Sequence, residues 1–151
     1  MTTPRRNTQR QLSVKEKGAV AVEFALVIPI FLVLVLGIFE FGRAFNIQVS
    51  LSEAARESAR YVAVHYSDPS FSVGAAKAVG VSAAPSVSLS TANVGISYQN
   101  ADGTSAPKCA AGVNAVSTVT VPTGFLTGID KLLKVNKPFT LKGTGVMRCG
   151  G

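Results

Sequence analysis

The chain has 151 residues, a formal net charge of +7, two cysteines and one histidine. This length allows one small domain, and so few Cys and His residues leave too few ligands for a zinc site. Residues 1–18 carry a net charge of +4 and the remaining residues +3, and no basic patch is interleaved with aromatic residues, so we do not expect nucleic-acid binding.

The first element is a basic leader followed by an apolar run. The leader carries Arg5, Arg6, Arg10, Lys15 and Lys17. The run, residues 19–39, is 21 residues long and contains one charge, Glu23; a helix needs about 20 residues to cross a bilayer. Because the positive charges lie on its N-terminal side, we expect the leader in the cytoplasm and residues beyond Arg43 outside.

The outer end of the run has no sign of signal-peptide cleavage. An ordinary secretory signal has a shorter apolar stretch that ends in small residues of the A-x-A type, whereas this run ends in Phe-Glu-Phe-Gly-Arg at residues 39–43. Glu40 and Arg43 are three residues apart, which predicts an intrahelical ion pair at the headgroup level. A contact between this pair and a partner subunit is the alternative.

The junction at Gly18 has the layout of a membrane-anchored pilin-like subunit. Prepilin peptidases cut after a glycine on the cytoplasmic side of the apolar helix, and here cleavage would give Ala19 a new α-amine. Glu23 would be the fifth residue of the product, and at low dielectric its carboxylate could pair with the amine of a neighbouring subunit. Alternatively, Glu23 lies within about 6 Å of the leader end and could reach the interface without a specific role.

The segment after Arg43 is predicted to continue as a helix as far as Ser67, before Asp68-Pro69 ends it. It contains neither Pro nor Gly. Small and apolar residues at spacings of three and four form one narrow stripe, made of Ile47, Leu51, Ala54, Ala55, Ser58 and Val62. We expect this stripe to pack on the chain's own C-terminal domain, and self-association along a filament is the alternative.

Three segments of this N-terminal half occur in a recognisable order. They are Lys-Gly-Ala-Val-Ala-Val-Glu-Phe-Ala-Leu-Val-Ile-Pro at residues 17–29, Gly-Ile-Phe-Glu-Phe-Gly-Arg at 37–43, and Ala-Ala-Arg-Glu-Ser-Ala-Arg-Tyr at 54–61. Together they resemble the TadE family of tight-adherence pilus assembly proteins. The resemblance implies a pseudopilin or minor subunit of an adhesion pilus, with prepilin peptidase cleavage between Gly18 and Ala19, and a role in subunit assembly for Glu23 and Phe24.

The C-terminal part reads as a small α+β domain. Residues 71–84 predict a short helix, and Phe125, Leu126, Ile129, Leu132 and Leu133 predict a further apolar helical turn or two. Alternating residues predict strands at 94–98, at 115–121 and from Phe139 to Cys149. The fold class is therefore α+β, with a long transmembrane helix that continues into an outer helix packed on a small antiparallel sheet, expected to be a three-stranded meander. The expected segments are 1–18, 19–40, 41–67 and 68–151.

Cys109 and Cys149 are both expected outside the membrane, where an even number of cysteines favours a disulfide. No metal or other cofactor is expected. His65 is the only histidine, and no nucleophile–base pair or phosphate-binding loop can be assembled, so an enzyme such as a secreted hydrolase is not expected.

Two functions follow from these patterns. The first is a pilin-like structural subunit of a tight-adherence (Flp-type) pilus, anchored in the bacterial cytoplasmic membrane by a single span. Its expected partners are the membrane, a prepilin peptidase and other pilin and pilus-assembly subunits, with no small-molecule substrate. The alternative is an uncleaved single-pass surface protein whose outer domain binds a ligand.

Overall fold

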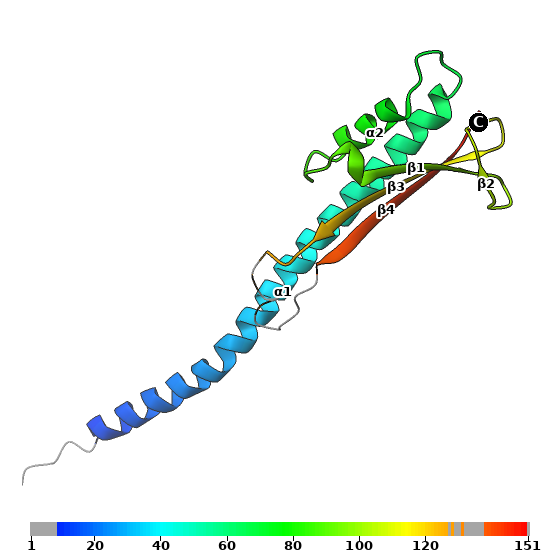
Figure 1. Ribbon diagram of the computed structural model, residues 1–151. Helices are drawn as coiled ribbons and strands as arrows, with labels where there is room; N and C mark the ends of the chain where they lie inside the picture. Colours follow the sequence, from blue (N-terminus) through cyan, green and yellow to red (C-terminus); the bar gives the residue numbers. More distant parts are fainter. Residues whose placement is uncertain (1–8, 127, 129–130, 132–137, 151) are drawn as a thin grey trace, which may run out of the picture. The chain divides into compact units, whose positions relative to one another are not determined.

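The computed structural model describes residues 9–126, 128, 131 and 138–150. They fall into two units, divided between Phe39 and Glu40. The elements, shown in Figure 1, are α1 (Gln9–His65), α2 (Val73–Ser82), the short 3₁₀ helix η1 (Thr91–Asn93), β1 (Val94–Gln99), β2 (Ser105–Ala106), β3 (Asn114–Thr123) and β4 (Phe139–Arg148). The chain is α+β, as its sequence predicts.

In unit 1 the structure describes the N-terminal part of α1. The helix already includes Gln9, ten residues before the expected start at Ala19, because the end of the leader is rich in Gln, Arg, Lys and Glu, which favour helix. Every residue from Gly18 to Phe39 is exposed. In the part of the chain that the structure describes, α1 is the one helix that is long and apolar enough to cross a membrane. It fits a single-pass membrane anchor.

Unit 2 is built on a four-stranded sheet with the order β2-β1-β3-β4, in which every neighbouring pair is antiparallel. The three predicted strands are β1, β3 and β4. These three strands pair in chain order, as the expected meander requires. The prediction missed a fourth strand, β2, which lies at the edge of β1. With only two residues, β2 has no alternating pattern by which a sequence could reveal it. Of the predicted apolar turns after β3, Phe125 and Leu126 are not helical; Ile129, Leu132 and Leu133 lie outside the described residues.

The core of unit 2 lies between the sheet and the C-terminal part of α1. The predicted stripe on α1 is fully buried at Leu51, Ala54, Ala55, Ser58 and Val62, and Ile47 packs against the same core. The facing side of the sheet contributes the buried residues Val94, Ala115 and Val119. The expectation that the stripe packs on the chain's own domain is therefore confirmed.

Two glycines of β4 bring the strand into direct contact with the α1 backbone, and Figure 1 shows α1 running beside β3 and β4. A Cβ added at Gly143 would overlap the carbonyl group of Leu51, and one added at Gly145 would lie 2.5 Å from the carbonyl oxygen of Ala55. Real Cβ atoms do not approach other atoms so closely. Only glycine at these two positions allows α1 to lie on the strand.

Helix α2 packs on α1 through small residues as well. Its buried residues are Ala76 and Gly80, which lie on one face because they are four residues apart. A Cβ added at Gly80 would lie 3.0 Å from Cβ of Ser58 and 3.1 Å from the carbonyl oxygen of Ala54. The α1 stripe thus contacts both the sheet and α2.

Candidate functional site

The four residues predicted at the junction all lie on α1 in unit 1. Gly18, Ala19, Glu23 and Phe24 are exposed. Ala19 and Glu23 are four residues apart and therefore share one face of the helix. A Cβ added at Gly18 would meet no atom within 4 Å. The face that carries Glu23 is thus accessible to a neighbouring molecule, and the peptide bond after Gly18 lies within the helix.

Glu40 and Arg43 form a polar site at the start of unit 2, with partners in the loop after β3. Arg43 Nε donates a hydrogen bond to Glu40 Oε2 at 3.3 Å. The backbone N–H of Leu126 donates to Glu40 Oε1 at 2.6 Å, and Arg43 Nη2 donates to the carbonyl oxygen of Gly124. These three hydrogen bonds, which we call the Glu40 clamp, hold the loop after β3 against the first turns of α1 in unit 2.

The burial of Glu40 explains why the clamp needs these partners. Glu40 is only 6 % exposed, and a carboxylate removed from water is costly unless it is paired and hydrogen-bonded. The sequence predicts the pair with Arg43 but not the contacts with Gly124 and Leu126. Both of those partners are backbone groups more than 80 residues further along the chain, and no side-chain pattern marks them.

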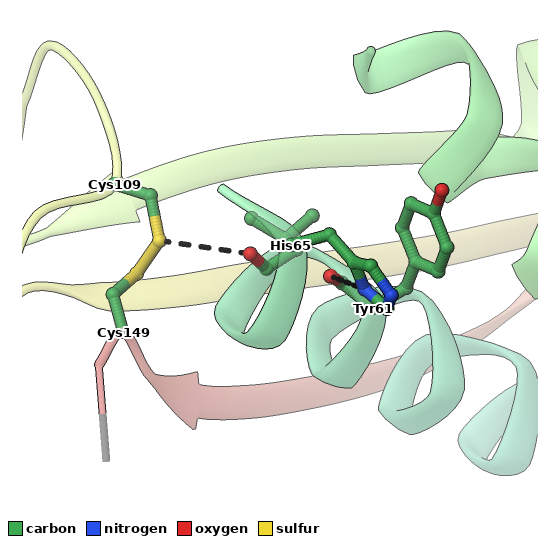
Figure 2. The surroundings of a disulfide bond; sticks show 5 residues. Tyr61, His65, Cys109 and Cys149 are labelled. Carbon is green, nitrogen blue, oxygen red and sulfur yellow. Dashed lines mark hydrogen bonds between the residues drawn. A yellow bond between two sulfur atoms is a disulfide. The ribbon is translucent and has the colours of Figure 1, made fainter. Parts of the chain in front are cut away.

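Cys109 and Cys149 form the expected disulfide, with a Cα–Cα distance of 5.9 Å (Figure 2). The bond joins the loop before β3 to the residue that follows β4, and both cysteines are buried. Cys109 Sγ lies 4.0 Å from the carbonyl oxygen of Val62, so the bridge packs directly on α1. It fixes the far end of the sheet to the helix.

Other titratable groups of unit 2, such as His65 and Asp102, take part in structural contacts. Figure 2 shows the ring of His65 stacked on that of Tyr61, with a centroid distance of 4.2 Å, and His65 Nδ1 donates to the Tyr61 carbonyl oxygen at 3.0 Å. Hydrogen bonds from the hydroxyl and N–H of Thr104 lower the pKa of Asp102, and burial raises the pKa of Tyr98. Among the residues described, no group of three or more His, Cys, Asp and Glu could hold a metal ion.

Fold and site together define a small α+β unit attached to a single long apolar helix. A family model described as TadE-like protein matches residues 18–60. This range contains the junction, the apolar run, the Glu40–Arg43 pair and most of the buried stripe, and the match confirms the resemblance seen in the sequence. It suggests a pilus-associated, pilin-like protein, from a family that is generally structural rather than catalytic. No curated protein and no solved structure matches the chain.

Proposed function

We propose that the chain is a pilin-like subunit that is anchored in the bacterial cytoplasmic membrane and takes part in assembling a tight-adherence (Flp-type) pilus. The observation that carries this proposal is the TadE-like match over residues 18–60, which begins at Gly18 and includes Glu23. The role is structural. The chain's own contributions are a helix for neighbours to dock against and a rigid outer unit.

The membrane anchor is supported by the exposure of the apolar run. Twenty-two consecutive residues, from Gly18 to Phe39, are exposed, and water would not tolerate so continuous an apolar surface. Lipid or the helices of other subunits must cover it. The cations of the leader favour a cytoplasmic N-terminus, which would put unit 2 on the outer side.

Maturation is proposed to occur by cleavage between Gly18 and Ala19. The α1 helix must unwind locally for a peptidase to reach this bond, and glycine is the residue at which a helix unwinds most readily apart from proline. The new amine of Ala19 and the carboxylate of Glu23 would then lie on one face of the helix. In a bundle of subunits, Glu23 of one copy pairs with the amine of the next and sets their register.

The alternative is a surface protein that keeps its leader and never assembles. One observation favours it: α1 runs without interruption through Gly18, so the bond is not presented in an extended form. In that case the leader would remain as a cytoplasmic extension of the anchor, and Glu23 would have no amine to pair with.

The mature N-terminus of the protein from its native cells separates the two functions. N-terminal sequencing is expected to begin at Ala19, and this product should be lost when the prepilin peptidase is deleted. Gly18→Val should block cleavage, whereas Gly37→Val should not. Gly37→Val is the matched control, since a Cβ added at either glycine meets nothing within 4 Å and both variants should therefore fold. An intact leader in peptidase-containing cells would contradict the proposed maturation.

A further inference from the structure

The two faces of the sheet in unit 2 differ in chemistry. Side chains alternate along a strand, and Ala115 and Val119 are buried in the core, so the even-numbered residues of β3 lie on the other face. A Cβ at Gly143 or Gly145 would point at the α1 backbone, so the even-numbered residues of β4 also face away from the helix. Three directly opposed pairs on this side are polar: Asn114–Arg148, Thr118–Thr144 and Thr120–Lys142. We call these six residues the outer polar face.

The charges of the outer polar face have one sign. Lys142 and Arg148 are exposed, and no residue of β1, β3 or β4 is acidic. Within the described ranges, neither cation forms an ion pair. The exposed side of α1 is different, because acidic and basic residues alternate along it and Glu57 pairs with Arg60 at 3.1 Å. Protein surfaces ordinarily mix both signs, so a face that carries cations only is suited to an anionic partner.

The four neutral side chains of the outer polar face are available for hydrogen bonds. In the part of the chain that the structure describes, none of them bonds to another protein group. Comparable side chains elsewhere in unit 2 are engaged: the Asn93 amide donates to the Thr120 carbonyl oxygen, and the Asn100 amide donates to the Thr104 hydroxyl. Hydroxyl and amide groups both donate and accept, so the outer polar face can bind a partner rich in such groups.

The spacing of the two cations indicates an extended partner. Lys142 and Arg148 are six residues apart on one strand, which is about 20 Å at 3.4 Å per residue. A polymer with acidic groups at intervals and hydroxyl groups between them matches this arrangement. Carboxylates and sulfates accept charge-assisted hydrogen bonds from Lys and Arg, and sugar hydroxyls can pair with Thr and Asn. A nucleic acid would need aromatic side chains on which its bases could stack, and none of the six residues is aromatic.

We propose that the outer polar face binds an acidic polysaccharide. The polymer lies along β4, with its anionic groups on Lys142 and Arg148 and its hydroxyls on the Thr118–Thr144 pair between them. The ligand contacts unit 2 alone. The inference depends neither on cleavage of the leader nor on pilus assembly, and therefore applies to either function above.

Binding of dextran sulfate to the full chain in detergent tests this proposal, with unsulfated dextran as the matched polymer. The leader is also basic, so the comparison between variants decides the outcome. Lys142→Gln combined with Arg148→Gln removes both cations of the face. Arg56→Gln combined with Lys77→Gln is the control, since it removes the same charge from α1 and α2. Near-UV circular dichroism checks that each variant is folded.

The variant without Lys142 and Arg148 is expected to bind dextran sulfate about tenfold more weakly, and the control variant less than about twofold more weakly. Thr118→Val combined with Thr144→Val keeps the charge and should weaken binding about threefold. Three results would overturn the proposal. They are no binding of dextran sulfate by the unaltered chain, equal weakening in the two charge variants, and equally tight binding of unsulfated dextran or of a single-stranded oligonucleotide.

Discussion

Gly145→Ala is expected to be among the most destabilising single-methyl changes that unit 2 can undergo. The added Cβ would lie 2.5 Å from the carbonyl carbon and oxygen of Ala55 and from the backbone nitrogen of Arg56. All three are atoms of the helix backbone, which cannot turn aside as a flexible side chain could. The strand and α1 must therefore separate by roughly 1 Å to restore an ordinary contact distance.

The size of the loss follows from that separation. Inserting one methyl group into a packed core costs about 1–3 kcal/mol, and a gap of 0.5–1 Å forfeits a quarter to a half of the dispersion energy of the atoms that line it. Because the gap would open along fully buried residues such as Leu51 and Ala55, we expect the upper end, about 3 kcal/mol. For a unit of this size that lowers the melting temperature by about 10–20 °C.

Thermal unfolding of the full chain in detergent would measure this loss by near-UV circular dichroism. The chain has three tyrosines and no tryptophan, and all three tyrosines pack against the buried cluster around the disulfide, so the tyrosine signal reports unit 2 and not the membrane helix. Gly95→Ala on β1 is the matched control, since its Cβ would lie an ordinary 3.6 Å from the nearest atom, the Thr118 carbonyl oxygen. If Gly145→Ala cost no more than Gly95→Ala, the close helix–strand contact would be refuted.

Two further changes test the other structural contacts. Cys109→Ser should lower the free energy of unfolding by about 4 kcal/mol, because the bridge closes a loop of 40 residues; the loss should vanish in reductant, and an equal loss with and without reductant would argue against the bond. Glu40→Ala should raise amide exchange at Leu126 at least about tenfold by removing its charged acceptor, whereas Glu40→Gln keeps an acceptor oxygen and should raise it less. Unchanged exchange in Glu40→Ala, followed by mass spectrometry or NMR, would mean that the clamp does not hold the loop.

The sequence predicts the main elements of unit 2 because each has a clear period. The stripe on α1 repeats at three and four residues, and residues such as Val94, Ile96 and Tyr98 alternate along β1. The disulfide follows from cysteine number and compartment. These features are local or depend on composition, so a single sequence is enough to reveal them.

What the sequence does not reveal depends on contacts between distant backbone groups. The clamp on Glu40 uses the N–H of Leu126 and the carbonyl of Gly124, and backbone groups carry no residue-specific signal. Gly143 and Gly145 did offer a signal, since glycine inside a strand often marks the close approach of another backbone. Both glycines lie in the strand predicted from Phe139 to Cys149, but the sequence could not show that α1 lies against that strand.

The proposed role of Glu23 in connecting subunits of a pilus is tested most directly by piliation of a strain that lacks this chain. Sheared pili should be restored by the unaltered protein. Glu23→Ala should enter the membrane equally well, because it removes a charge from the apolar run, yet restore few or no pili. Abundant pili with Glu23→Ala, or with no copy of the chain at all, would contradict the claim.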